Sequence, residues 1–212
     1  MAAQFEPQGI VGTQSNSDGN TKTVRISRGG QQIANLGHGK YYELVRDGVV
    51  YLAQTAVTGV APGTAIGTTA AAALYNPAGS GKLVVLLHTG MGYVSGTLGA
   101  GVISYCVNTN LVAAAVTGTA MAHRNALVGA AAAASASALT TATLPAAPTP
   151  IRNFGSMGPM LATSVVQPWI LQDEVDGAII LKPGATVSLQ ATAGAGTSPL
   201  VTFGFMWAEM PE

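Results

Sequence analysis

The sequence predicts an all-β protein, a jelly-roll-like antiparallel β-sandwich with an extended N-terminal arm. The clearest strand signal is Val201–Trp207, where apolar residues at every second position share one face. Similar short runs recur between glycine- and proline-rich turns, which indicates roughly eight to ten strands in a sandwich or jelly roll. Charged residues make up only 8% of the 212 residues, against about 25% in an average soluble domain, so we expect other subunits to cover apolar surface.

The N-terminal part is expected to form an arm. Residues 1–20 are polar and rich in turn-forming residues, which is typical of a leader segment. Thr21–Ser27 then alternates, with Val24 and Ile26 on one face, and predicts a first strand. We therefore divide the chain into residues 1–36, the N-terminal arm and first strand, and residues 37–212, the β-sandwich (jelly-roll) domain.

A hairpin is predicted where the sandwich domain begins. Tyr41–Arg46 and Val49–Gln54 both resemble strands. Asp47-Gly48 stands between them, and this dipeptide is a strong signal for a two-residue hairpin turn. Residues 55–70 consist mainly of Thr, Gly, Ala and Pro, which predicts a loop.

Further strands follow from apolar or alternating runs in the rest of the chain. They are Ala71–Tyr75, Lys82–His88, Val102–Asn108, Ala178–Leu181 and Thr186–Thr192. Pro183-Gly184 is a turn signal before the last of these. In the final strand, Phe203, Phe205 and Trp207 are expected in the core between the two sheets.

Residues 111–149 allow more than one interpretation. Leu111–Met121 is compatible with a strand. Asn125–Leu139 is rich in alanine, which favours a helix by propensity. The same run contains serines and no charged residue, so it predicts either a short packed helix or an extended loop.

Acidic residues are missing from the centre of the chain. No Asp or Glu occurs between Gly48 and Gln172, and the only formal charges there are Lys82, Arg124 and Arg152. Most enzyme sites use Asp or Glu as a base, nucleophile, metal ligand or orienting partner. This composition favours a structural protein over an enzyme, and we assign no catalytic, cofactor-binding or metal-ligating residue.

Charge and hydrophobicity also argue against several partners. Nine basic and nine acidic residues cancel, which speaks against a broad nucleic-acid footprint. No run approaches the ~18–20 apolar residues of a membrane-spanning helix. Met1–Pro7 lacks the basic and apolar regions of a secretory signal. Cys106 is the single cysteine, so an internal disulfide is excluded, and we expect a small buried thiol.

Two glycine-rich segments resemble ligand-binding loops but depart from the motifs. Gly79–Lys82 looks like part of a phosphate-binding loop, yet Asn76 and Leu83 stand where that motif requires Gly and Ser or Thr. A turn that leads into a buried strand, with Lys82 at its solvated end, explains it better. Gly90–Gly96 misses the dinucleotide fingerprint by one residue and predicts close backbone packing or a bulge.

The histidines and the acid cluster do not form a recognisable site in the sequence. His38, His88 and His123 lack metal-ligand spacing to another His, Cys or acid. We expect His38 in a solvated loop, His88 in the core or an interface, and His123 on the surface or at a subunit contact. Asp173–Asp176 suggests a solvated turn more than a calcium loop. Trp169 is expected to anchor the loop before it.

Several segments resemble a group of structural proteins of tailed bacteriophages. The matching residues are Gly37–Glu43 with Arg46 and Gly48–Val50, the turn Leu74–Leu83, Ser95–Gly101, and the ending Trp207–Pro211. The resemblance touches residues 37–105 and the last strand, and it implies a jelly-roll virion component. It further implies a capsid decoration (cement) protein, a homo-oligomer such as a trimer, that binds the major capsid protein or another virion protein and is located in the virion after assembly in the host cytoplasm.

Two other functions compete with this expectation. A tail, fibre or head-fibre binding module for a host-surface ligand would use exposed aromatics or a calcium loop, for which Trp169, Tyr93 and Asp173–Asp176 are the candidates. A cupin-like metal enzyme would need converging histidines and an acid, and the sequence offers three scattered histidines. For the decoration protein, residues 1–36 are expected to lie across neighbouring shell subunits, so deleting residues 1–20 would weaken attachment and leave the domain folded.

Overall fold

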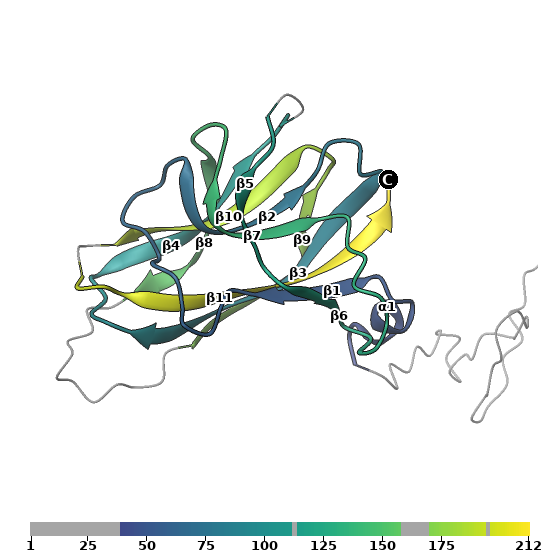
Figure 1. Cartoon of the computed structure of the whole chain (residues 1–212), viewed down its shortest axis with the longest axis horizontal. Coiled ribbons are helices and arrows are strands. Elements are labelled where there is room, and N and C mark those ends of the chain that lie inside the picture. Colours follow the sequence, from purple (N-terminus) through teal and green to yellow (C-terminus); the bar gives the residue numbers. More distant parts are fainter. Residues whose placement is uncertain (1–38, 112–113, 158–169, 194–195) are drawn as a thin grey trace, which may run out of the picture. The chain divides into compact units, whose positions relative to one another are not determined.

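The computed structural model describes residues 39–111, 114–157, 170–193 and 196–212 (Figure 1). The chain divides into two compact units, residues 1–42 and residues 43–212. The predicted arm, the strand at Thr21–Ser27, His38 and Trp169 all lie outside the described residues. The second unit contains the eleven strands of the described part of the chain.

The described elements are one short helix and a series of strands. They are α1 (Tyr42–Arg46), β1 (Val50–Gln54), β2 (Thr69–Asn76), β3 (Lys82–Ser95), β4 (Gly101–Asn108), β5 (Thr117–Ala120), β6 (His123–Asn125), β7 (Ser137–Thr143), β8 (Thr149–Met157), β9 (Ile170–Leu181), β10 (Ala185–Ala193) and β11 (Leu200–Pro211).

The strands pair as a nested series. β1 pairs with β11, β2 with β10, β3 with β9 and β4 with β8, all antiparallel. One long ladder is thus rolled into two sheets, with orders β6-β1-β11-β3-β9 and β5-β7-β2-β10-β4-β8. An eight-stranded roll of this kind is the jelly roll, and β5, β6 and β7 are inserted where the long ladder turns back. The predicted all-β sandwich is confirmed.

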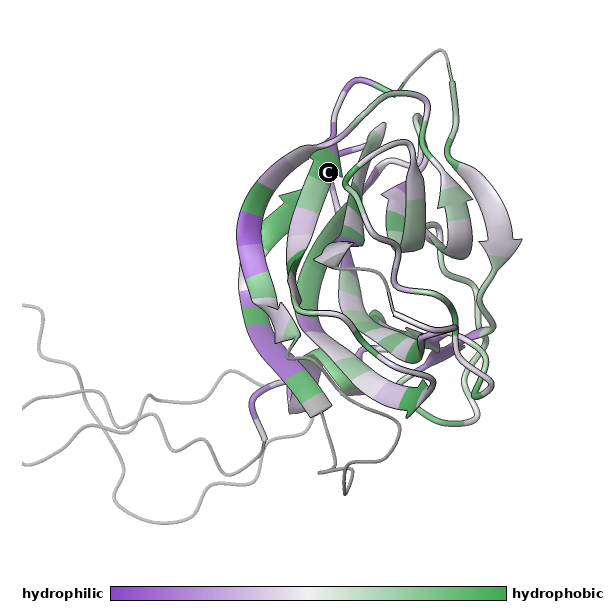
Figure 2. Cartoon of the chain, turned by 90° about the vertical axis from the view of Figure 1, so that its left-hand side faces the viewer, coloured by the Kyte–Doolittle hydropathy of each residue, from purple (hydrophilic) through white to green (hydrophobic). Residues whose placement is uncertain are grey.

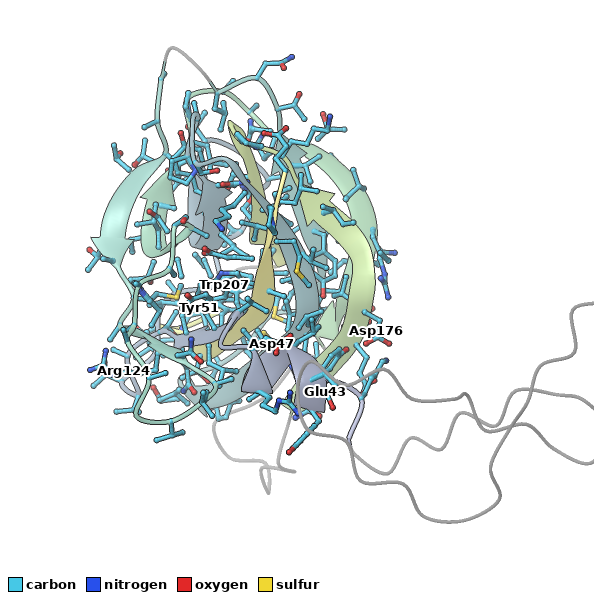
Figure 3. The ribbon with its side chains drawn as sticks, turned by 90° about the vertical axis from the view of Figure 1, so that its right-hand side faces the viewer. Glu43, Asp47, Tyr51, Arg124, Asp176 and Trp207 are labelled. Carbon is cyan, nitrogen blue, oxygen red and sulfur yellow. The ribbon has the colours of Figure 1, made fainter. Side chains whose placement is uncertain are left out.

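The core lies between the two sheets. Along β11, Val201, Phe203, Phe205 and Trp207 are buried, as the alternating sequence predicts. The Trp207 ring stacks on Tyr51 from β1 with the ring centroids 5.9 Å apart, and the two side chains lie together in Figure 3. Figure 2 shows the resulting hydrophobic bands alternating with paler or hydrophilic ones along the strands.

The outer face of the six-stranded sheet is partly covered by the chain itself. Ala73 and Tyr75 of β2 point away from the main core and form a second buried cluster with Leu111, Val116 and Leu144. The Leu111 amide donates to the Gly184 carbonyl at 2.8 Å, and the Leu144 amide donates to the Thr68 carbonyl at 2.7 Å. These bonds tie the covering segments to the sheet.

The predicted hairpin at Asp47-Gly48 is wrong. Residues 42–46 form α1, and Gly48 has φ of +71°, the left-handed conformation that ends many helices. The Gly48 amide donates to the Val45 carbonyl at 2.9 Å, and the Val49 amide donates to the Leu44 carbonyl at 3.3 Å. This pair of bonds is a Schellman motif, so Asp47-Gly48 terminates a helix rather than reversing a strand.

The predicted solvated turn at Asp173–Asp176 is also wrong. These residues belong to β9, which begins well before the predicted strand at Ala178–Leu181. The strand tolerates them because it is an edge strand with an irregularity: Glu174 pairs with His88, and the next paired residue is Ile179. Asp176 and Gly177 have φ of +52° and +81°, which bends the chain at this point.

Residues 111–149 contain shorter strands than the sequence suggests. Within Leu111–Met121, only Thr117–Ala120 forms a strand, and 112–113 lie outside the described residues. The alanine-rich run is an irregular loop that leads into β7, and no helix forms in it. The sequence analysis missed β6, β7 and β8, of which β8 is mostly exposed and lacks clean alternation.

Candidate functional site: a hollow on the five-stranded sheet

The outer face of the five-stranded sheet has a hollow of about 620 Å³. Its lining comes from β1, β3, β6 and β11, together with Ala122. The lining residues are Leu52, Ala53, Gln54, His88, Gly90, Met91, Gly92, Ala122, Arg124, Thr202, Gly204, Phe205 and Met206. This volume falls within the ~300–1,000 Å³ that is usual for ligand sites.

The strand register arranges the outward side chains in rows across the sheet. One row runs from Arg124 on β6 through Leu52, Met206 and His88 to Glu174 on β9. Apolar side chains occupy its centre, and an arginine and a glutamate occupy its two ends. Arg124, Leu52, Met206 and His88 of this row form one wall of the hollow, and Glu174 lies beyond it.

The next row forms the floor, because two glycines face each other there. It runs from Gln54 on β1 through Gly204 and Gly90 to Gln172 on β9. Two residues further along, on the same face, Gly92 pairs with Thr202. The hollow exists because these central positions carry no side chain.

A bulge in β3 turns the glycines outward. Leu87 has no partner on β11 or on β9, where the register passes directly from Leu86 to His88. Val84 and Leu86 are buried before this point, and Thr89 and Met91 are buried after it. An extra residue in a strand exchanges its two faces. Without the bulge, the alternation that begins at Val84 would direct His88 and Gly90 into the core.

Neither Gly90 nor Gly204 is required by the fold. A Cβ atom added at Gly90 would meet nothing closer than 3.8 Å, and one at Gly204 nothing closer than 3.7 Å. Neither residue has a φ in the left-handed region. Glycine within a strand costs about 0.5–1 kcal/mol relative to alanine. Gly92 differs, because its Cβ would lie 3.0 Å from the Thr202 hydroxyl. The predicted close backbone packing is confirmed at Gly96, where a Cβ would collide with the Ser198 backbone.

The ionisable side chains among the lining residues are basic. Arg124 is the charged residue among the lining residues, and His88 adds a second basic group. The Arg124 Nη1 donates to the His123 carbonyl at 2.9 Å, which holds the exposed guanidinium near the sheet edge. Figure 3 shows Arg124 at the periphery, away from the buried Tyr51 and Trp207.

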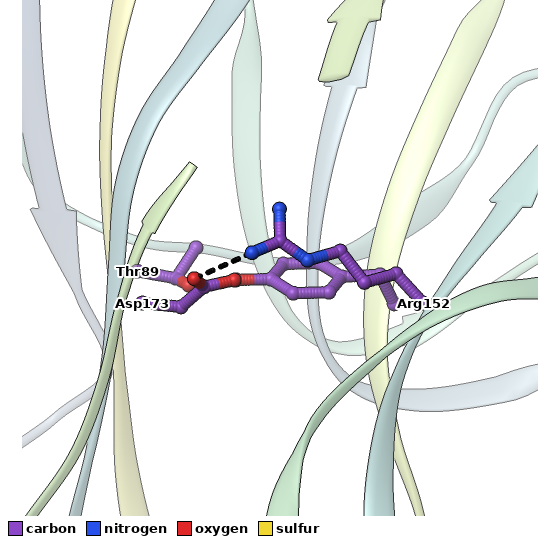
Figure 4. A network of polar contacts seen from close by, with 4 residues as sticks. Thr89, Arg152 and Asp173 are labelled. Atoms are coloured by element: carbon purple, nitrogen blue, oxygen red, sulfur yellow. Dashed lines mark hydrogen bonds and ion pairs between the residues drawn. The ribbon is translucent and has the colours of Figure 1, made fainter. Parts of the chain in front are cut away.

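A second polar cluster joins the two sheets at their edges (Figure 4). Tyr105 on β4 donates its hydroxyl hydrogen to Asp173 on β9 at 2.9 Å, and its oxygen also contacts the Thr89 hydroxyl. Arg152 on β8 pairs with Asp173 at 2.8 Å and lies over the Tyr105 ring. Burial raises the pKa of Tyr105 well above its usual value, and the Asp173 carboxylate raises it further while Thr89 opposes the rise. The polar groups of this cluster are hydrogen-bonded or ion-paired to one another, which is typical of a network that holds two sheets together.

Glu209 is a buried acid that the sequence analysis did not single out. It is 5% exposed, and its carboxylate accepts hydrogen bonds from the Ser135 and Ala136 amides, both at 2.9 Å, and from the Trp207 indole at 3.2 Å. Burial and, next, this carboxylate raise the pKa of Tyr51. The signal was present in the sequence, because position 209 continues the inward face of Phe203, Phe205 and Trp207.

The other candidate residues from the sequence lie apart from one another. His88 lines the hollow, so the core is the wrong place for it, and the other expected place, an interface, stays a prediction. His123 is half-buried, and its Nε2 lies 3.2 Å from the Ala132 carbonyl in an exposed contact, which agrees with the expected surface position. Cys106 is fully buried, which confirms the expected thiol, and burial raises its pKa to about 11. The Tyr93 hydroxyl donates to the Gly96 carbonyl at 2.5 Å.

The turn before β3 is a structural turn, as predicted. Gly79 and Gly81 both have positive φ, and β3 begins at Lys82. The Asn76 amide group donates to the Lys82 carbonyl at 2.7 Å and to the Leu181 carbonyl at 2.9 Å, which fixes the turn on the adjacent strand.

Within the described ranges, no three His, Cys, Asp or Glu residues come together in a way that would hold a metal ion. The same part of the chain contains no helix long and apolar enough to cross a membrane. Comparisons with protein-family models, curated proteins and solved structures found no match to this chain. The hollow is therefore interpreted from its own geometry.

Proposed function

We propose that this chain is a non-enzymatic virion structural protein, a capsid decoration protein that binds and stabilises a head shell through oligomeric contacts. The observation that carries the proposal is the outer face of the five-stranded sheet. It exposes Leu52, which lines the hollow, to 43%, and Ile180 on β9 to 53%. Exposed apolar surface of this kind marks a site of protein association.

The low charge of the whole chain supports the same role. Only 8% of its residues are charged, so little of its surface is built to face water alone. A stable interface buries about 1,600 Å² in total, which would cover a large part of one sheet face. The proposed partner is the major capsid protein or another virion protein, and the proposed location is the virion.

The alternative is a tail or fibre module that binds a host-surface ligand. It is favoured by the volume of the hollow, which suits a small ligand as well as a protein segment. Two of its sequence candidates have other partners, however. Tyr93 donates its hydroxyl hydrogen to Gly96, and Asp173 pairs with Arg152 and Tyr105.

The first test is the mass of the purified protein in solution, measured by light scattering after size exclusion. A homotrimer would have a mass of about 64 kDa, three times 21.2 kDa. The second test is co-sedimentation with purified shells that have lost this protein. Saturable binding that protects the shells against heat supports the proposal, whereas a monomer that does not co-sediment contradicts it.

A further inference from the structure

We propose that the hollow is a docking groove for an extended segment of another protein that carries one apolar side chain and one carboxylate. The inference rests on the proposed function, because it assigns the face through which the protein would contact its shell partner. Three features of the described residues support it: the glycine floor, the length of the floor row, and the sign of the charge.

The glycine floor has a cost that the fold does not explain. Gly90 and Gly204 sit opposite each other in the centre of the sheet, where β-branched residues normally stabilise strands. A Cβ atom added at either position would meet nothing closer than 3.7 Å. Glycine inside a strand often marks a place where another backbone or ligand approaches closely. We infer that these positions are kept open for an occupant.

The length of the floor defines the size of that occupant. The row of lining residues crosses four adjacent strands, β6, β1, β11 and β3. Adjacent strands lie about 4.8 Å apart, so the row is roughly 14 Å long. An extended chain rises about 3.3 Å per residue, so about four residues fit along the row. Such a segment crosses the strands on their face, and its recognition depends on side chains.

The walls define the chemistry of the occupant. Leu52 and Met206 form an adjacent cross-strand pair beside the glycine floor, which suits one apolar side chain placed over Gly90 and Gly204. At the β6 end, Arg124 presents a guanidinium, and the lining residues in the described part of the chain include no acid; Glu174 lies beyond the lining at the opposite, β9 end. Arginine binds carboxylates through two parallel hydrogen bonds, so an acidic residue is the expected partner at that end.

The test uses the full-length protein labelled with ¹⁵N and a blocked tetrapeptide, acetyl-Asp-Ala-Phe-Ala-amide, as the probe. Saturable shifts are expected at the amides of Leu52, Gly90 and Gly204. Replacing the peptide Asp by Asn, or its Phe by Ala, should weaken binding at least fivefold. Gly90→Val should abolish the shifts, because the new side chain fills the floor at a position where a Cβ atom meets nothing closer than 3.8 Å.

Charge reversal gives a matched pair of variants. Arg124→Glu should weaken the Asp peptide at least fivefold and improve binding of a peptide with Lys in that position. Lys182→Glu changes the same charge at an exposed residue outside the hollow, and it should leave binding unchanged. Absence of shifts in the wild type, or equal binding to Gly90→Val, would overturn the proposal. So would an oligomer that dissociates on Gly90→Val, because the occupant would then be a second copy of this chain.

Shell binding separates this inference from the function on which it rests. If the wild type binds purified shells and Gly90→Val does not, both are supported. If both proteins bind shells equally, the groove is wrong and the function stands. If the peptide binds as expected but the wild type does not bind shells, the groove stands and the function is wrong.

Discussion

Glu209 is a buried acid that holds the loop before β7 in place through hydrogen bonds. Its carboxylate is the acceptor for the Ser135 and Ala136 amides, in a segment whose alanine-rich sequence offers no charged group of its own. Without this acceptor the two amides would be buried near the core with no ionised partner. The irregular path of that segment is therefore explained by one residue in β11, about 70 positions further along the chain.

Replacing Glu209 by glutamine should destabilise the protein by about 1–3 kcal/mol. Both carboxylate oxygens accept hydrogen bonds from backbone amides, whereas the NH2 group of glutamine is a donor and would leave one of those amides without an acceptor. Urea unfolding followed by circular dichroism measures this as a lower midpoint with an unchanged slope. Glu212→Gln is the matched control, since Glu212 is exposed, and it should not shift the midpoint. An unchanged midpoint for Glu209→Gln would mean that the carboxylate is not needed.

Tyr105 should make the free energy of unfolding decrease as the pH rises into the alkaline range. Burial first, and the Asp173 carboxylate next among the raising causes, lift the pKa of Tyr105 above the ordinary value of 10.0. Above about pH 10 the unfolded chain therefore binds fewer protons than the folded one, so the free energy of unfolding falls as the pH rises. Below about pH 10 both states are neutral at this residue, and it adds no pH dependence.

Tyr105→Phe should remove part of that alkaline loss. We expect it to cost about 0.5–1.5 kcal/mol near neutral pH, through the lost hydrogen bonds, and to flatten the decline above about pH 10. Urea unfolding at several pH values measures both effects. Tyr42→Phe, at an exposed tyrosine, should keep the wild-type slope. A Tyr105→Phe protein that declines as steeply as the wild type would refute the assignment.

At the level of elements, α1 shows why a dipeptide signal misleads. Asp-Gly is equally suited to a hairpin turn and to a helix C-terminus, because both need a residue with positive φ. Alternation in Tyr41–Arg46 is too short to separate a strand from a helical turn. The hydrogen bonds of the Gly48 and Val49 amides decide the matter, and only the folded chain shows them.

Gly48→Ala should destabilise the end of α1 by about 1–2 kcal/mol, because alanine is strained in the left-handed conformation. The site has room, since an added Cβ would lie 3.9 Å from its nearest neighbour, so strain alone is tested. Gly48→Asn should lose less, because asparagine tolerates this conformation better. Thermal unfolding measures the order of the three proteins, and equal losses for Ala and Asn would argue against a conformational cause.

The strands that the sequence predicts best are those with one buried and one exposed face. β11 follows this pattern, and its inward residues were identified correctly. β3 does not, because Leu87 forms a bulge and exchanges its faces halfway along. The hollow was therefore beyond prediction, since it depends on that bulge and on Gly90 facing Gly204, a register that a single sequence does not contain. The burial of Glu209 could have been predicted, because it lies two residues after Trp207 and so continues the inward-facing positions of β11.

At the scale of the whole molecule, the nested pairing makes the fold cooperative. β1 must find β11, its neighbour in the five-stranded sheet, from the far end of the described chain. The pairs β2·β10, β3·β9 and β4·β8 then close inside it. Pairing strands that are distant in the sequence costs loop-closure entropy, and each pair formed reduces that cost for the next. The sandwich is therefore expected to unfold cooperatively, in one step.

Cys106, the single cysteine, reports on this opening. It lies on β4, which is paired with β10 and β8, and its side chain is fully buried. Burial raises its pKa to about 11, so near pH 8 the native thiol is both hidden and protonated. A disulfide reagent such as dithionitrobenzoate should then react only with chains that have opened. We expect the reaction rate to rise with urea along the same slope as global unfolding.

Cys106 could also become accessible without global unfolding, if the edge strand β8 separates from β4 by itself. Pro150 stands opposite Cys106 where the register of β4 and β8 shifts, and proline cannot donate a ladder hydrogen bond. If β8 separates by itself, Cys106 will react at a rate that is independent of low urea concentrations. Pro150→Ala would then slow the reaction, because the restored amide can strengthen the edge. A rate that follows global unfolding in both proteins would instead show that β8 opens only with the whole sandwich.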